Sequence, residues 1–199
     1  MREGLKNKKL VAAIFTLWLP AVGYGLHRMA DYANTPGRLA SPPAQWPSDA
    51  PLPPARGRAS ILVFAHPQCP CSRATIGELA WLVAHAHGKA VASVFFYLPS
   101  SEKRDWATTD LWRSATAIPG VQAIVDPDGA MARRFGASTS GQTLLYDSSG
   151  RLAFNGGITI ARGHSGGNDG RDAIAGLLAG AIPRHRTTSV FGCSLLKED

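Results

Sequence analysis

The sequence predicts an α/β fold: a mixed β-sheet flanked by helices and preceded by an N-terminal membrane helix. Short apolar runs typical of buried strands alternate with segments of helical periodicity, and a hairpin pattern and a last helical segment follow them. A basic N-terminus in front of a long apolar run predicts the membrane helix. With 199 residues, the chain has room for one ordinary domain plus extensions.

The membrane segment is predicted over residues 1–27. Basic residues at its start (Arg2, Lys6, Lys8 and Lys9) precede an apolar run, Leu10–Leu26. The run is at the short end of what spans a bilayer, about 17–25 residues. It is an anchor or a signal segment, and we favour the anchor because the run continues past the small residues 21–23, where a signal would be cleaved. The basic flank predicts a single-pass cell-membrane protein whose domain lies on the periplasmic, or extracytoplasmic, side.

Residues 28–58 are rich in proline and poor in large apolar side chains, which predicts an extended, semi-rigid linker. The formal net charge of +7 lies mostly outside the domain that follows, because residues 59–182 hold ten Lys and Arg against nine Asp and Glu. A nearly neutral domain gives no support for nucleic-acid binding.

The domain, residues 59–182, begins with strands and helices in alternation. Continuous apolar or aromatic runs predict its strands, and apolar residues at helical spacing, ended by glycine or proline, predict its helices. In order, the expected elements are a strand Ile61–Ala65, a helix from Cys71 to about His87, a strand Val91–Leu98, a helix within 101–118, a strand Val121–Val125 and a short helix through Phe135.

The second half of the domain is predicted to contain a hairpin and a helix. Asp126-Pro127-Asp128-Gly129 forms a turn that caps the short helix. Residues 147–150, Asp-Ser-Ser-Gly, lie between two apolar runs, 143–146 and 152–155, and predict the hairpin. A last helix is expected over Asp169–Leu178, and residues 183–199 form a C-terminal tail.

Two cysteines separated by one proline, Cys69-Pro70-Cys71, lie where the first strand gives way to a helix. Backbone N–H groups and the positive end of the helix dipole stabilise a thiolate there, and Pro70 suits a first helical turn. We therefore expect a lowered pKa for Cys69, the attacking thiol. Cys71 is placed to resolve a mixed disulfide, and Arg73 adds positive charge. The pattern indicates a redox-active disulfide or a soft-metal site.

Other candidate site residues follow from the expected sheet. The carboxyl ends of parallel strands lie at one edge, where α/β folds carry their sites, and the first strand ends there at His66. The loop after the hairpin, residues 162–168, returns to that edge with His164. Cys193 is an odd third cysteine in the tail, and it joins the site if the tail folds back onto the pair.

Three further motifs accompany the cysteines: Val125-Asp126-Pro127-Asp128-Gly129, Leu144-Leu145-Tyr146-Asp147 and Gly150-Arg151. With the order of elements, they resemble the thioredoxin fold over about residues 59–180, and within it the redoxin branch of TlpA-like proteins. The resemblance implies a membrane-anchored, exported thiol–disulfide oxidoreductase without a cofactor. Its partners would be protein thiols and disulfides and a membrane or exported redox partner, and an exported location suits a cysteine pair that cycles through a disulfide.

Two positions depart from that family's pattern. The family separates its cysteines by two residues, whereas here Ser72 occupies the second position and Cys71 comes one residue earlier. The family also has a cis-proline facing the site before the first strand of the hairpin, and counting back from Asp147 places Gly141, beside Ser140, there. Loss of that proline opens the site to metal or changes how substrate peptides pair with the backbone.

A copper site is the alternative. Soft thiolates select Cu(I), and Cys69 and Cys71 on one tight turn can share an ion. His66, His164 and Cys193 are candidate additional ligands. Under this hypothesis the protein binds and delivers copper on a thioredoxin fold, and resembles copper-handling proteins of the Sco type.

Overall fold

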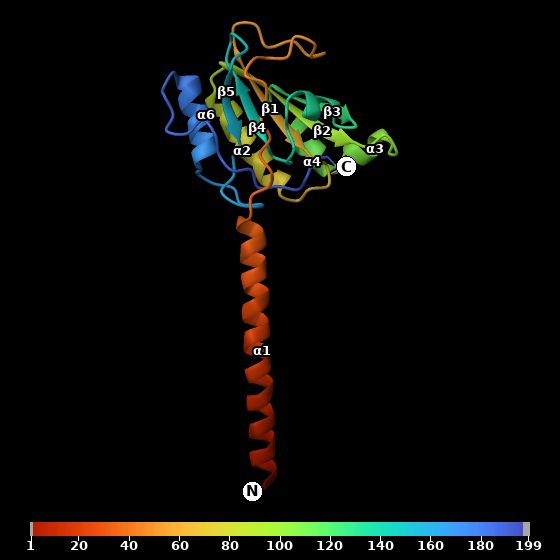
Figure 1. The fold of residues 1–199 in the computed structure, drawn as a ribbon, viewed down its shortest axis with the longest axis vertical. Helices are drawn as coiled ribbons and strands as arrows, with labels where there is room; N and C mark the ends of the chain where they lie inside the picture. The colour runs from red at the N-terminus through yellow and green to blue at the C-terminus, as the bar shows by residue number, and fades with distance from the viewer. Residues whose placement is uncertain (1, 197–199) are drawn as a thin grey trace. The chain divides into compact units, whose positions relative to one another are not determined.

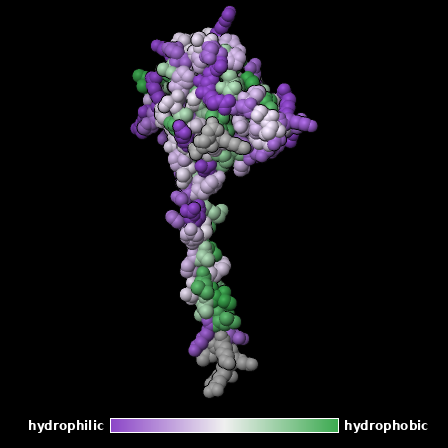
Figure 2. All heavy atoms as spheres, turned by 45° about the vertical axis from the view of Figure 1, so that its right-hand side comes forward, coloured by the Kyte–Doolittle hydropathy of each residue, from purple (hydrophilic) through white to green (hydrophobic). Residues whose placement is uncertain are grey.

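The computed structural model describes residues 2–196. The chain divides into two compact units, one ending at Thr35 and the other beginning at Pro36. The first is a helix, α1 (Arg2–Asn34), which continues past the predicted residues 1–27. Its segment Asn7–Asn34, with a mean hydropathy of 1.5, is long and apolar enough to cross a membrane. Many apolar side chains of this helix, such as Leu17, are exposed. Figure 2 shows hydrophobic residues gathered along part of the helix.

The second unit contains a five-stranded mixed sheet in the order β3-β2-β1-β4-β5 (Figure 1). β2 pairs in parallel with both β1 and β3, whereas β4 is antiparallel to both β1 and β5. The strands are β1 (Ala59–Ala65), β2 (Ala90–Leu98), β3 (Val121–Pro127), β4 (Thr143–Tyr146) and β5 (Leu152–Gly156). The predicted mixed sheet, with its β4–β5 hairpin, is confirmed.

The two faces of the sheet are covered by different elements because side chains alternate along β1. Val63 belongs to an apolar cluster that includes Leu79 of α2 and Ile174 of α6. Its neighbour Phe64 belongs to a second cluster on the opposite face, which includes Phe135. The helices of this unit are α2 (Ser72–His85), α3 (Arg104–Ala107), α4 (Asp110–Thr116), α5 (Ala130–Arg134) and α6 (Asp169–Ala179).

One predicted helix is divided in two. The sequence predicts a helix within 101–118, but α3 and α4 are separate because Thr108 between them has a non-helical backbone (φ −90°, ψ 53°). The predicted capping turn is present, since both carboxylate oxygens of Asp126 accept backbone N–H bonds from the first turn of α5, at 2.8 and 3.0 Å.

The proline-rich segment, residues 36–58, packs on the domain. Trp46 lies between two buried aromatic rings, 4.9 Å from Phe135 and 5.2 Å from Tyr146 between ring centroids. The hydroxyl of Tyr146 donates to Pro43 O at 2.9 Å. The compact unit therefore begins at Pro36, and not at residue 59 as the composition predicts. The prolines keep the segment extended, and the apolar groups between them bind it to the sheet.

The C-terminal tail also belongs to the compact unit. Thr187 forms a parallel bridge with Asn155 of β5, and Val190 is buried. Farther along, Thr139 and Ser194 form an antiparallel bridge. Of the tail predicted over 183–199, residues 197–199 lie outside the described part of the chain. The described tail thus runs from the edge of the sheet to the segment that precedes β4.

Candidate functional site

Cys69 lies in the turn that joins β1 to α2. Cys69 N donates to His66 O at 3.0 Å, and Ser72 N donates to Cys69 O at 3.1 Å, so the chain winds into the helix through three-residue turns. Cys71 is the N-cap of α2 and has a helical backbone. The helix therefore starts at Ser72, one residue later than predicted. Both cysteines are buried, Cys69 with 3% and Cys71 with 7% of its surface exposed.

A third thiol reaches Cys69 from the tail. The sulfur of Cys193 lies 3.1 Å from the sulfur of Cys69. Antiparallel backbone bonds hold it there: Ser140 N donates to Cys193 O at 2.8 Å, and Leu195 N donates to Ser138 O at 2.9 Å. The fold thus brings Cys193 to the site. The sequence alone predicted this contact only if the tail folds back onto the cysteine pair.

Gly192 allows the tail to come this close. A Cβ atom at this position would overlap the carbonyl oxygen of Ser140. Its own carbonyl accepts a hydrogen bond from the guanidinium of Arg162, in the loop between β5 and α6. The residue before Cys193 is therefore fixed from two sides, and only glycine fits.

Hydrogen bonds make Cys69 the acidic thiol of the cluster. Burial alone would raise the pKa of Cys69, but hydrogen bonds to its sulfur outweigh burial and lower the pKa. The partners are the thiol and backbone of Cys193, the hydroxyl of Ser72 and the backbone of Cys71. The last is the helix-start N–H effect that the sequence suggested.

The other two thiols stay protonated. Burial, followed by the nearby charge and hydrogen bond of Cys69, raises the pKa of Cys71. Burial, followed by the hydrogen bond and charge of Cys69, raises the pKa of Cys193 to about 12. The positive charge of Arg162 works in the opposite direction on both. When Cys69 is deprotonated, Cys193 is thus the neutral S–H donor to its sulfur.

Two serines connect the Cys69 sulfur to the segment that precedes β4. Ser72 Oγ lies 2.6 Å from Ser140 Oγ, and the backbone N–H of His66 donates to Ser140 Oγ at 2.8 Å. Because Ser140 accepts from His66, its own hydroxyl hydrogen is available to Ser72, whose hydrogen can then point to Cys69. Ser72, which takes the place of the family's second cysteine, therefore acts here as a donor to the first.

Gly141 takes the place of the family's cis-proline without reproducing it. Residues 2–196 contain no cis peptide bond. Gly141 has a φ of +93°, a conformation that favours glycine. Its N–H donates to Phe64 O at 2.7 Å, which ties the segment before β4 to β1. The segment thus keeps its place beside the cysteines through a backbone bond that proline could not make.

The ring of His66 packs among aromatic side chains. It packs against Tyr97 and Trp106, with centroids 5.9 and 5.3 Å away, and its Nδ1 accepts from Gln68 N at 3.3 Å. Burial lowers the pKa of His66. His66 contributes to the site through its backbone N–H, which donates to Ser140 Oγ. Pro70, between the two cysteines, is exposed.

The cation at the cysteines is Arg162, which sequence reasoning missed. The predicted cation, Arg73, is exposed and forms an ion pair with Asp110 on α4. His164 is also exposed, and its Nδ1 lies 2.9 Å from Arg162 O within its own loop. The loop therefore reaches the cysteines through Arg162, two residues before the predicted candidate His164.

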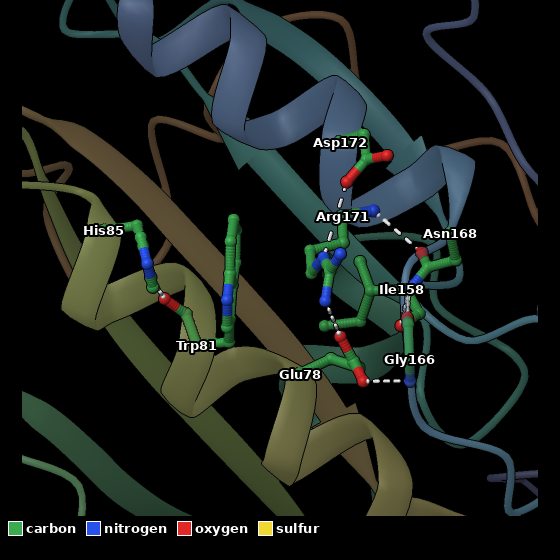
Figure 3. Close-up of polar contacts among 8 residues, drawn as sticks. All are labelled: Glu78, Trp81, His85, Ile158, Gly166, Asn168, Arg171 and Asp172. Atoms are coloured by element: carbon green, nitrogen blue, oxygen red, sulfur yellow. Dashed lines mark hydrogen bonds and ion pairs between the residues drawn. The ribbon is translucent and has the colours of Figure 1, made fainter.

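A buried ion pair holds this loop against α2 (Figure 3). Glu78 Oε2 pairs with Arg171 Nη1 of α6 at 3.1 Å, and Glu78 Oε1 accepts from Gly166 N at 2.6 Å. The guanidinium of Arg171 also lies over the ring of Trp81, 4.2 Å from its centroid. Asn168 caps α6 by accepting from Arg171 N at 2.8 Å. These contacts fix the α6 end of the loop that carries Arg162.

The described part of the chain holds no group of three or more His, Cys, Asp or Glu side chains arranged as a metal site. The candidate extra copper ligands His66 and His164 make the contacts described above. A two-sulfur site of Cys69 and Cys71, with Cys193 beside them, is the ligand set left for Cu(I).

No protein-family profile and no curated protein matches the chain. A hypothetical protein from Sinorhizobium meliloti is 20% identical, with a TM-score of 0.57 over 81% of this chain and 93% of that one. An uncharacterized conserved protein from Geobacillus kaustophilus is 14% identical, with a TM-score of 0.59 over 83% and 93%. A secreted Mycobacterium tuberculosis disulfide oxidoreductase, homologous to E. coli DsbE, is 17% identical, with a TM-score of 0.46 over 63% and 83%.

The strand order and the similarity to the first two structures define the class: the domain has a thioredoxin-like fold. The element order and motifs that suggested this fold in the sequence are confirmed. At these identities the comparisons establish the fold, and the chemistry has to be argued from the cysteines.

Proposed function

We propose that the protein is a membrane-anchored, exported thiol–disulfide oxidoreductase whose attacking thiol is Cys69. One observation carries the proposal: a buried thiol with a lowered pKa has a second, protonated thiol 3.1 Å from its sulfur. A thiolate with an adjacent protonated thiol has what disulfide exchange needs, a nucleophile and a group that resolves the product.

The reaction needs no cofactor. The Cys69 thiolate attacks one sulfur of a substrate disulfide, forms a mixed disulfide and releases the other sulfur as a thiolate. A second cysteine of the cluster then gives up its proton and attacks Cys69, which releases the reduced substrate. Two electrons pass from the protein to the substrate, and the reverse sequence oxidises a substrate dithiol. Cys71 is the resolving thiol that the Cys-Pro-Cys pattern predicts. Cys193 is a second candidate, because its thiol is also within hydrogen-bond distance of the Cys69 sulfur.

The proposed location rests on α1 and the chemistry. Helix α1 is long and apolar enough to span a membrane, and the basic residues at its start favour a cytoplasmic N-terminus. The domain would then face the exported side, where disulfides form and persist. Its substrates there would be protein thiols and disulfides, with a membrane or exported redox partner to regenerate it.

The experiment is exchange with oxidised glutathione, followed by mass spectrometry on the full chain in detergent micelles. We expect glutathione to add to Cys69 first, and a Cys69→Ser variant to lose the reaction by at least about a hundredfold, since its hydroxyl is a weak nucleophile. Cys71→Ser is the matched control and should still form the first adduct. Failure of Cys69 to react, together with tight Cu(I) binding that Cys69→Ser abolishes, would replace this proposal with the copper alternative.

A further inference from the structure

Cys69 has two candidate resolving thiols, and they differ in how they are attached. Cys71 is joined to Cys69 through a single residue, Pro70, in a turn already closed by the bond from Ser72 N to Cys69 O. Proline fixes its own φ, so this short ring has little freedom to bring two sulfurs together in a relaxed disulfide. Cys193 arrives on a separate segment, so no short covalent ring limits its approach.

Cys193 is also already in contact with the nucleophile, with which Cys71 shares a hydrogen bond as well. Its sulfur is 3.1 Å from that of Cys69, and a disulfide requires the two sulfurs to come about 1 Å closer. The backbone around Cys193 is paired on both sides, through Ser140 N and Ser138 O. The segment 192–195 thus docks beside residues 138–140 through an isolated antiparallel bridge, which brings Cys193 to Cys69.

We infer that Cys193 is the resolving thiol, and that the tail segment 192–195 is a built-in peptide partner that closes the site when the Cys69–Cys193 disulfide forms. The inference rests on the proposed function and assigns its second step. With oxidised glutathione as the oxidant, the Cys69 thiolate takes one glutathionyl group and expels a glutathione thiolate. Cys193 then gives its proton to that thiolate, attacks the Cys69 sulfur and expels the second glutathione as a thiolate. One protein disulfide forms, and one glutathione disulfide is reduced.

The electrostatics agree with this order of events. While Cys69 is a thiolate, its charge and hydrogen bond help to keep Cys193 protonated. Formation of the mixed disulfide removes that charge, whereas the positive charge of Arg162 stays. Cys193 therefore becomes more acidic only after Cys69 has reacted, which is when a resolving nucleophile is needed.

The docked segment also explains why the nucleophile is covered. Cys69 is only 3% exposed, so a protein disulfide must displace part of what covers it. The segment 192–195 occupies the backbone bonding positions of Ser138 and Ser140. An extended, cysteine-bearing segment of a substrate would compete for the same positions, and a glycine before its cysteine would let it approach Ser140 as Gly192 does.

The test is disulfide mapping of the full chain after titration with oxidised glutathione, with free thiols alkylated before digestion. We expect the oxidised protein to contain a Cys69–Cys193 bond and an alkylated Cys71. Cys71→Ser should keep this bond. Cys193→Ser should accumulate the Cys69–glutathione adduct about tenfold or more above wild type, because the resolving thiol is gone.

A second variant tests the docking itself. Gly192→Val places a side chain against the Ser140 carbonyl, so Cys193 should leave the site, and alkylation of Cys69 by a bulky maleimide should accelerate about tenfold or more. Ser194→Ala is the matched control, because it keeps the paired backbone and removes an exposed hydroxyl. A Cys69–Cys71 bond with free Cys193, after normal glutathione exchange at Cys69, overturns the inference and leaves the proposed function intact. No exchange at Cys69 overturns both.

Discussion

The two sides of Cys69 are held in place by different kinds of interaction. On one side, the turn into α2 is closed by bonds between residues three apart, such as Ser72 N to Cys69 O and Ala74 N to Cys71 O. On the other side, the tail and the segment before β4 are joined by backbone bonds between distant parts of the chain, such as Ser140 N to Cys193 O. The first side can form locally, whereas the second exists only in the complete fold.

This difference bears on the chemistry because the Cys69 thiolate depends on both sides. The turn supplies the backbone of Cys71, and the distant side supplies Cys193. Ser72 belongs to the turn, but its hydroxyl is oriented by Ser140 from the distant side. We therefore expect changes on the distant side to alter reactivity and stability more than changes on the turn side.

The largest expected effect on stability comes from the Glu78–Arg171 ion pair, which joins α2 to α6 and so links distant parts of the chain. Arg171→Ala should lower the free energy of unfolding by about 3–5 kcal/mol, because it leaves the carboxylate of Glu78 buried without its partner. Urea denaturation followed by far-UV circular dichroism measures this. Arg73→Ala breaks an exposed pair on the turn side and is the control, with no measurable change in the midpoint. Equal losses in both variants would show that the buried pair has no special role.

The next effect is on the acidity of Cys69. Ser140→Ala removes the group that orients Ser72, so the pKa of Cys69 should rise and its alkylation at pH 7 should slow by about tenfold, the effect of one hydrogen bond to a charged group. The midpoint of the pH profile of the iodoacetamide alkylation rate should shift to higher pH. Ser194→Ala, also in the docked region but exposed, should leave the profile unchanged. An unchanged profile for Ser140→Ala would show that the Ser140–Ser72 contact does not lower the pKa of Cys69.

The local side of the site is also the side that the sequence could predict. The apolar run of β1, the proline between the cysteines and the helical spacing after them all lie within one short stretch, and the structure differs from the prediction by one residue at the start of α2. Cys69 could be proposed as the nucleophile because its helix-start environment follows from its neighbours in the chain.

The distant side could be predicted only in outline. Arg162 was overlooked because an arginine in a glycine-rich loop has no distinguishing pattern, and His164 beside it offered familiar site chemistry. The packing of residues 36–58 was missed because the prolines dominated the composition, although Trp46 gave a signal: a large apolar ring needs a place to be buried. Gly192 before Cys193 was a similar signal, since its meaning depends on a contact with Ser140.

A smaller effect, on the rate at which the Cys69–glutathione adduct is resolved, should distinguish Arg162 from Arg73. Arg162→Gln removes the positive charge that lowers the pKa values of Cys71 and Cys193, so resolution of the Cys69–glutathione adduct should slow on the order of threefold. The effect is modest because a less acidic thiol is intrinsically more nucleophilic. Quenched-flow mass spectrometry measures the step directly. Arg73→Gln should leave it unchanged, since that charge is paired with Asp110. A slower step in Arg73→Gln alone would assign the cationic role to the turn side after all.

The smallest effect is a difference in the pH dependence of stability between reduced wild type and Cys193→Ser. Folding raises the pKa of Cys193 from its ordinary value of 9.0 to about 12, chiefly through burial. Between these values the unfolded chain loses a proton that the folded protein keeps, so the free energy of unfolding falls as the pH rises through this window. Cys193→Ser lacks that titration and should lose less stability between pH 9 and pH 11.

Three other groups shape the same curve without obscuring the difference. Burial raises the pKa of Tyr146 to about 12 and also raises the pKa of Cys71, and both shifts lower the stability of both proteins at high pH. The lowered pKa of Cys69 contributes stability that is fully present above its ordinary value of 9.0 and is lost as the pH falls through the folded pKa. Reduced wild type should therefore be most stable near pH 9 and decline more steeply above it than Cys193→Ser. Parallel curves above pH 9 would mean that Cys193 is not held as a half-buried, protonated thiol beside the Cys69 thiolate. The distant side of the site would then have no electrostatic role.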